Sequence, residues 1–210
     1  MIDNIDELYK LLREHNMTCL NRERFVSAAQ KVCDVIEKNI EGSIVECGTY
    51  RCGCLAIMAK CAFPHKRIWG FDTFEGLPLP SSKDGRMAVG RGGSTDLCSP
   101  IENAFDAYRL INASSDHTVL VKGLFQETLS RNKTYLGKIA VLRLDGDWYE
   151  STKVCLEELY DQVTVGGWII IDDYGHWPGC KLAVDEFIAR RNLHVNLIAS
   201  DGSERCWIKQ

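Results

Sequence analysis

This sequence of 210 residues predicts an α/β fold with a mostly parallel sheet and an antiparallel end. Short apolar runs alternate with amphipathic helical stretches over most of the chain, which is the pattern of consecutive βαβ units. The runs 139–144 and 168–171 are almost entirely hydrophobic, as expected of strands buried on both faces of a parallel sheet. Close to the C-terminus, two short strands flank Asp201-Gly202, a dipeptide typical of hairpin turns. We therefore expect seven strands, with helices on both faces of the sheet.

The composition fits one globular domain. Hydrophobic residues make up 45% and charged residues 26% of the chain, which is enough apolar material for one sizeable core. Residues 1–42 are expected to form N-terminal helices, and 43–210 the core that carries the site. The net charge of −4 disfavours binding to nucleic acid, which requires a basic face. Small molecules or neutral sugars are the expected partners.

The sequence shows no segment that would direct it to a membrane or out of the cell. Its first residues are acidic and polar, and no apolar run is long enough to span a bilayer. We therefore expect a cytoplasmic protein without a membrane span. The ten cysteines form no CxxC pair and no zinc set, so we interpret most of them as buried small side chains or free thiols.

The first part of the chain contains two helices ahead of the sheet and then the first βα step. The helices at 2–14 and 22–39 carry apolar residues at helical spacing. A strand at 43–47, a glycine turn, a helix at 55–62 and a second strand at 67–71 follow. The order of strand, glycine turn and helix indicates a ligand cradle, because the missing side chain admits a cofactor and the helix N-terminus offers free amides.

The glycine turn excludes one common class of cofactor. It offers Gly48 and Gly53 only, so the dinucleotide pattern GxGxxG fails at its middle glycine and a nicotinamide or flavin is not expected. Asp72 closes the second strand about 20 residues after the turn, where an acidic side chain accepts hydrogen bonds from ribose hydroxyls. A nucleoside without the diphosphate is therefore indicated. The alternative for Asp72 is a cap for the turn that follows it.

The second part continues the alternation after a long polar loop at 79–99. Gly123 and Phe125 follow the third strand, at another place where the backbone can approach a flat ring. The other expected elements outside the central unit are a helix at 101–111, a strand at 117–122, a helix at 181–191, and strands at 194–199 and 205–209.

The βαβ unit built from the two apolar strands carries the residues that indicate a function. A helix at 151–160 joins the strands, and because such crossovers are right-handed, both carboxyl ends meet at one edge of the sheet. Asp145 and Asp147 follow the first strand, and Asp172 and Asp173 follow the second. Converging carboxylates repel one another unless a cation or a substrate shares their charge, so they indicate a metal site. The alternative is that each Asp only caps the helix after its turn.

Several motifs are shared with one family. In chain order they are ECGTYRCG, FDTFEGLP, GLFQETL, LRLDGDWYEST and GGWIIIDDYGHWPGCKLAVDEF. Together they resemble the macrocin O-methyltransferases, metal-dependent enzymes that methylate deoxysugar hydroxyls of macrolide and aminocoumarin antibiotics. The resemblance runs from about residue 22 to the C-terminus. It implies a Rossmann-like class I methyltransferase fold, with an antiparallel last strand, that uses S-adenosylmethionine (AdoMet) and Mg²⁺.

The resemblance also implies roles for individual residues. Asp145, Asp172 and Asp173 correspond to the Mg²⁺ ligands, and Asp147 to the general base. One departure is Cys52, which stands where the family usually has the first of two glycines. The residues expected against AdoMet are Glu46, Gly48 and Tyr50 at its methionine end, Asp72 and Thr73 at its ribose, Gly123 and Phe125 at its adenine, and Asp145 beside it.

The implied reaction is methyl transfer to a sugar hydroxyl, for example on a rhamnose-type residue of a glycan or of a glycosylated natural product. A metal with hard oxygen ligands orients the hydroxyl and lowers its pKa, and Asp147 takes the proton. His176, which follows the second acidic turn, is the rival for the base. Two other interpretations stay open, a metal-dependent hydrolase and a non-catalytic AdoMet- or glycan-binding module. A homo-oligomer also stays open.

The polar loop is the candidate moving part. We hypothesise that 81–99 forms a lid over the acceptor, because its ends lie on the active edge and no other segment is expected to exclude water there. Arg86 and Arg91 are expected to donate hydrogen bonds to acceptor hydroxyls or to an attached phosphate. The alternative is an idle surface loop.

Overall fold

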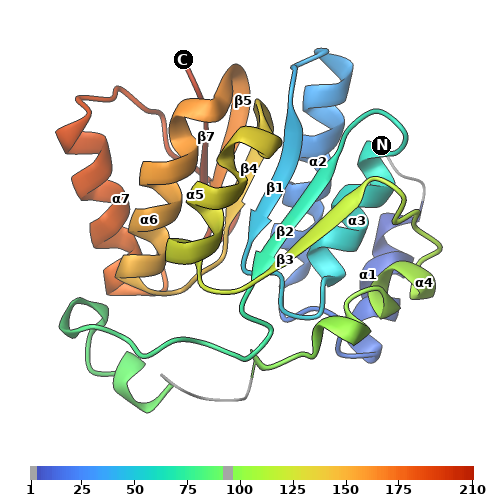
Figure 1. Cartoon of the computed structure of the whole chain (residues 1–210), viewed down its shortest axis with the longest axis horizontal. Coiled ribbons are helices and arrows are strands. Elements are labelled where there is room, and N and C mark those ends of the chain that lie inside the picture. Colours follow the sequence, from blue (N-terminus) through green and yellow to red (C-terminus); the bar gives the residue numbers. More distant parts are fainter. Residues whose placement is uncertain (1–3, 92–96) are drawn as a thin grey trace.

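A seven-stranded sheet forms the centre of the computed structural model, which describes residues 4–91 and 97–210 (Figure 1). The strands are β1 (Ser43–Cys47), β2 (Ile68–Asp72), β3 (Thr118–Lys122), β4 (Ile139–Leu144), β5 (Val163–Ile171), β6 (Ile198–Ala199) and β7 (Arg205–Ile208). Their order is β3-β2-β1-β4-β5-β7-β6. β7 pairs antiparallel with β5 and β6, and the other pairs are parallel. The predicted α/β fold with an antiparallel last strand is confirmed.

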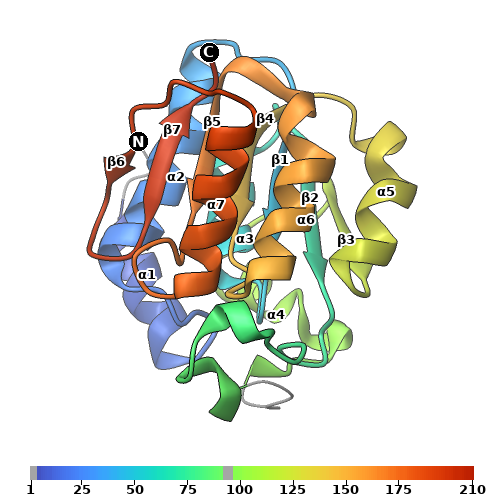
Figure 2. The same ribbon diagram turned by 90° about the vertical axis from the view of Figure 1, so that its left-hand side faces the viewer.

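Helices cover both faces of the sheet, as Figures 1 and 2 show. One face carries α1 (Ile5–Glu14), α2 (Arg22–Glu37), α3 (Gly53–Ala62) and α4 (Asp106–Leu110), and the other carries α5 (Phe125–Leu136), α6 (Tyr149–Leu159) and α7 (Pro178–Arg190). Successive strand residues point to opposite faces, so Ile44 and Val141 join the first apolar core while Val45 and Leu142 join the second. None of the helices in the described part of the chain is both long and apolar enough to cross a membrane.

Several elements differ from the sequence prediction. The helix expected at 101–111 is a 3₁₀ turn, Ile101–Asn103, followed by the short α4. β5 begins at Val163 rather than at residue 168, because Gly166 and Gly167, a pair typical of turns, lie inside the strand. A Cβ atom at Gly167 would lie 2.7 Å from the Ala140 carbonyl oxygen, so this glycine permits the close approach of β4. β6 has two residues instead of six, and the helix α5 was not predicted.

The carboxyl ends of β1, β4 and β5 meet at one edge of the sheet. The ladder continues into the turns, since the Asp145 N–H donates to the Cys47 carbonyl at 2.8 Å and the Asp172 N–H to the Leu144 carbonyl at 2.9 Å. The strand order reverses between β1 and β4, and ligands of open α/β sheets bind beside such a reversal. The predicted convergence of the acidic turns is thereby explained.

The first half of the polar loop is docked on the domain. It contains two short 3₁₀ helices, Ser82–Asp84 and Ala88–Gly90. The buried Asp84 carboxylate accepts hydrogen bonds from the Ser81 N–H at 2.7 Å and from the Tyr149 N–H at 2.6 Å. Part of the predicted lid, residues 92–96, lies outside the described residues. Because residues around Asp84 are anchored, the lid hypothesis is restricted to the part of the loop that follows them.

Candidate active site

A cavity of about 340 Å³ opens at this edge of the sheet. It is bordered by the turns after β1, β2, β4 and β5, by the start of α5, and by the segment that leads into α2. Gly123 is not among the lining residues, although Leu124 and Phe125, which follow it, are. The predicted site residues that line it are Glu46, Gly48, Tyr50, Asp72, Thr73, Phe125, Asp145, Asp147, Asp172, Asp173 and His176.

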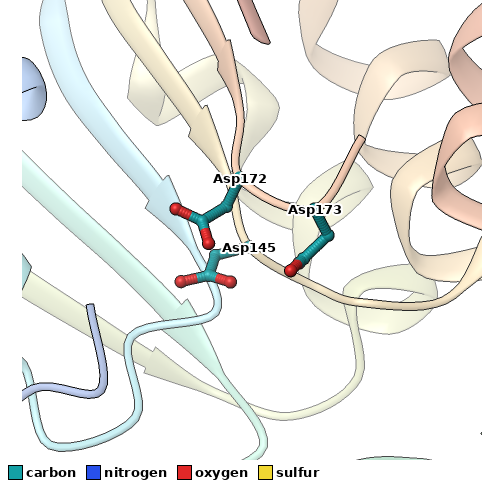
Figure 3. Close-up of side chains that lie close together, drawn as sticks. All are labelled: Asp145, Asp172 and Asp173. Atoms are coloured by element: carbon teal, nitrogen blue, oxygen red, sulfur yellow. The ribbon is translucent and has the colours of Figure 1, made fainter. Parts of the chain in front are cut away.

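Three carboxylates converge in this cavity (Figure 3). One oxygen each from Asp145, Asp172 and Asp173 lies within 4.8 Å of the others. Asp172 and Asp173 are buried, and Oδ2 of Asp173 has no hydrogen-bond partner in the described part of the chain. A compact set of oxygen donors with one buried, unpartnered oxygen fits a hard divalent cation such as Mg²⁺.

A buried arginine lies beneath the acidic cluster. Nη1 of Arg143 donates to Glu46 Oε1 and to Asp145 Oδ2, each at 2.8 Å, and Nη2 donates to Asp172. Both Arg143 and Glu46 are fully buried. The sequence analysis missed Arg143, although a charged residue within an otherwise apolar strand is a detectable signal of a buried ion pair.

A second arginine reaches the cluster from the N-terminal helices. Arg24, in the first turns of α2, pairs with Asp172 through Nη1 and with Asp201 through Nε at 3.1 Å. The sequence analysis assigned α2 to packing only, because its apolar face dominates the pattern. The contact joins residues 148 positions apart, and nothing in the local sequence indicates it.

Burial raises the pKa of several carboxyl groups here. The pKa of Asp172 is raised to about 7 by burial and by the charge of Asp145, against the lowering effect of Arg143. The pKa of Asp147 is raised to about 7 by the same two causes. For Asp173 burial, followed by the charge of Asp147, raises the pKa well above its ordinary value. Positive charge placed among these groups favours their ionised forms, as a bound divalent cation would.

Asp147 occupies the turn between β4 and α6 in a left-handed backbone conformation, with φ of 56°. Trp177 Nε1 donates to its Oδ1 at 2.6 Å, and the Trp177 ring packs edge-on against Trp148 with centroids 5.0 Å apart. The Asp147 carboxylate is therefore held through one oxygen, and the residue lines the cavity. His176 is exposed on the cavity rim and contacts the Trp177 ring at 4.7 Å. Sequence reasoning missed Trp177.

The glycine turn after β1 packs directly against the turn after β4. A Cβ atom at Gly48 would lie 1.8 Å from the Asp145 carbonyl oxygen, and φ at Gly48 is 91°. Gly48 is therefore required for the β1 turn to touch the β4 turn, in addition to any role toward a cofactor. Cys52 takes φ of 59° at the position where glycine was expected, so the turn keeps a left-handed residue there without a glycine.

Asp72 organises the same turn. Its Oδ2 accepts hydrogen bonds from the Thr49 N–H at 2.7 Å and the Tyr50 N–H at 2.8 Å, and Oδ1 accepts from the Phe74 N–H at 2.7 Å. The capping role considered for Asp72 is therefore present. The ribose contact of Asp72 stays a prediction. Three of the about four acceptor positions of this carboxylate are already used, so little capacity is left to accept hydrogen bonds from ribose hydroxyls. Thr73 donates its hydroxyl to the Gly76 carbonyl at 2.7 Å.

The sequence of this chain is similar to those of named O-methyltransferases. The profile of the macrocin-O-methyltransferase (TylF) family matches residues 12–209. Demethyldecarbamoylnovobiocin O-methyltransferase of Streptomyces niveus is 34% identical over 198 residues, which cover 90% of this chain and 74% of that protein. A tetracenomycin 4'-O-methyltransferase of Streptomyces olivaceus, whose printed name gives a dimethoxy-rhamnosyl substrate, is 32% identical over 82% of this chain and 68% of that protein.

Solved structures agree with this relationship. The O-methyltransferase NovP superposes with a TM-score of 0.85 and 33% identity, over 92% of this chain and 82% of that chain. The calicheamicin methyltransferase CalS11 shares the fold, with a TM-score of 0.71 and 22% identity over 99% of this chain and 94% of that chain. Methyltransferase relatives of this similarity argue against the hydrolase alternative. The chain belongs to the macrocin O-methyltransferase family and is an O-methyltransferase.

Proposed function

We propose that this protein is an AdoMet-dependent and Mg²⁺-dependent O-methyltransferase that acts on a hydroxyl of a sugar. One observation carries the proposal: the cluster of Asp145, Asp172 and Asp173 lies in the same cavity as Asp147 and as the glycine turn after β1. A donor site and a cation site thus share one edge of the sheet. Such a pair suits transfer of a methyl group to an oxygen that needs activation.

The donor would lie against the turns after β1 and β2. Glu46 borders the cavity, and its buried Oε2 has no hydrogen-bond partner within the residues described. Burial raises the pKa of Glu46 to about 7, and the ammonium of a methionine moiety would favour its ionised form. Phe125 borders the cavity on the β3 side and offers an apolar surface for adenine.

The cation would be held by Asp145, Asp172 and Asp173, and when bound it supplies charge that lowers the pKa of a sugar hydroxyl. Asp147 would accept the proton on Oδ2, because Oδ1 is held by Trp177. Burial raises the pKa of Asp147 to about 7, and a bound cation would lower it, so the carboxylate would be ionised and able to take a proton at neutral pH. The methyl carbon then bonds to the acceptor oxygen while its bond to sulfur breaks, which leaves S-adenosylhomocysteine (AdoHcy).

The acceptor side of the cavity is bordered by Leu77, Pro78, Arg91 and Trp177. Aromatic and apolar faces suit the C–H faces of a sugar ring, and Arg91 offers hydrogen-bond donors. The relatives named above act on a novobiocin precursor and on a rhamnosyl tetracenomycin. We propose a rhamnose-type deoxysugar on a glycan or natural product as the acceptor class, and the cytoplasm as its place of action.

The test is methyl transfer from labelled AdoMet to a panel of acceptors that contains nucleotide-activated rhamnose and rhamnosides with apolar aglycones. We expect transfer to at least one sugar in Mg²⁺ and a loss of at least about tenfold in EDTA, restored by excess Mg²⁺. Full activity in EDTA would contradict the metal dependence. Absence of AdoHcy binding by calorimetry would contradict the donor site.

A further inference from the structure

Two arginines share one carboxylate of the acidic cluster. Arg143 donates to Oδ1 of Asp172 from below, within the sheet, and Arg24 donates to Oδ2 from α2. Asp172 is 2% exposed, so both guanidinium groups contact it away from bulk water. Charges that meet away from solvent interact strongly, because they are weakly screened.

Arg24 is held in this position by a second carboxylate. Its Nε lies 3.1 Å from Oδ2 of Asp201, in the turn between β6 and β7. Asp201 is itself fixed, since it accepts hydrogen bonds from Asn21 Nδ2 at 2.6 Å, from the Ser203 N–H at 2.8 Å and from the Glu204 N–H at 2.7 Å. The guanidinium is therefore a fixed positive charge at the border of the cation site.

The position of Asp172 does not depend on Arg24 alone. Its backbone N–H donates to the Leu144 carbonyl at 2.9 Å, and the Ser203 hydroxyl donates to its carbonyl at 2.7 Å. Arg143 holds the other carboxylate oxygen. Removal of Arg24 would thus remove a charge from the site while most of the geometry stays.

We propose that Arg24, through its contact with Asp172, weakens the binding of a divalent cation by the acidic cluster, an inference that rests on the cation site of the proposed function. A cation held by Asp145, Asp172 and Asp173 must share Asp172 with the Arg24 guanidinium. Like charges bonded to one carboxylate repel each other. Arg24 therefore has two effects. It neutralises the charge of Asp172 in the folded protein, and it limits how tightly the cation binds.

The test measures Mn²⁺ binding by electron paramagnetic resonance on the full chain, without AdoMet or acceptor. We expect Arg24→Met to bind Mn²⁺ about tenfold more tightly, equivalent to about 1.4 kcal/mol, and Arg24→Lys to stay close to wild type because the charge is kept. Asp201→Asn should weaken binding, since it leaves Asp172 as the carboxylate that shares its charge with both Arg24 and the cation. Arg22→Met is the matched control, because Arg22 is exposed on the same helix and pairs with Asp6.

A second readout separates this role from a general loss of structure. Thermal unfolding without metal should occur at a lower temperature in Arg24→Met than in wild type, and saturating Mn²⁺ should remove that difference. Weaker or unchanged Mn²⁺ binding in Arg24→Met, or no opposite effect in Asp201→Asn, would overturn the inference and leave the proposed function intact. Wild-type protein that binds AdoHcy but no Mn²⁺ would overturn both the inference and the metal dependence.

Discussion

Buried charge dominates the candidate active site at the scale of single residues. Glu46 and Asp172 carry little exposed surface, and Arg143 links them within the sheet. Breaking one partner of such a network leaves an uncompensated buried charge, at a cost of about 3 to 5 kcal/mol. The network therefore fixes the carboxylates around the cavity before any ligand is present.

The titration of Glu46 gives a prediction for stability against pH. Burial raises its pKa from 4.5 to about 7, opposed by Arg143 and assisted by Asp145, and Cys54 also faces it. Between these two values the folded protein keeps a proton that the unfolded chain has lost. The free energy of unfolding should therefore fall as the pH rises from 4.5 to 7 and then level off. Urea unfolding of Glu46→Gln should show a flatter dependence over this window, and an identical slope would contradict the prediction.

Trp177 is expected to hold the base in place. Trp177→Phe removes the indole N–H that donates to Asp147. A hydrogen bond to a charged group contributes about 1.5 kcal/mol or more, so kcat should fall about tenfold while the KM for AdoMet stays unchanged. Trp168→Phe is the matched control, because it removes an indole hydrogen bond to Asp34, which does not line the cavity. A KM effect without a kcat effect would place Trp177 in binding instead.

At this scale, the sequence predicted the residues whose signal is local and missed those whose contacts are distant. The acidic turns were predicted from the sequence because their residue types and their places after strands are local features, and the structure brings Asp145, Asp172 and Asp173 together. The contacts of Arg24 and Trp177 depend on packing between distant elements, which no local pattern encodes. Their roles became visible only in three dimensions.

At the scale of elements, the polar loop and α6 depend on each other. α6 starts without a side-chain cap of its own, and the Tyr149 N–H donates instead to Asp84, which lies 65 positions earlier. Trp148 adds a hydrogen bond from Nε1 to the Pro78 carbonyl at 2.8 Å. The loop therefore braces the turn that carries Asp147.

Asp84→Ala tests this bracing. The substitution removes the carboxylate that caps α6 and that accepts hydrogen bonds from the Ser81 and Tyr149 N–H groups. The free energy of unfolding should therefore fall by about 2 kcal/mol. Limited proteolysis should also cut the stretch around Arg86 sooner, since its anchor is gone. Asp106→Ala on α4 serves as the control, because Asp106 is partly exposed and pairs with Arg109 of its own helix. Unchanged stability together with unchanged cleavage would show that the loop is held by other contacts.

Element boundaries were predicted well where one principle decides them. β1 and β4 begin and end at the predicted residues, 43–47 and 139–144. β5 was predicted too short, because Gly166 and Gly167 are typical of turns yet lie in the strand where backbones approach closely. β6 was predicted too long, because an edge strand is limited by its single partner and not by its own sequence.

At the scale of the whole molecule, both ends of the chain contribute to one site. Residues 17–20 and Arg24 border the cavity ahead of the sheet, and the turn between β6 and β7 holds Arg24 from the other end. Of the N-terminal helices, which were expected only to pack against the core, α2 therefore takes part in the candidate active site through Arg24, together with the segment that leads into it. These segments lie together beside the point where the strand order reverses, between β1 and β4.

The proposed function requires one edge of the sheet to carry a donor site and a separate cation site. The most direct test is the single-turnover rate of Asp172→Asn, measured with AdoMet already bound and Mg²⁺ at saturation. We predict a rate at least about 100-fold below wild type, with an AdoHcy dissociation constant within about twofold of wild type, because the substitution removes a cation ligand and leaves the donor turns in place. An undiminished rate, or the loss of AdoHcy binding together with the rate, would contradict the division of the edge into two sites.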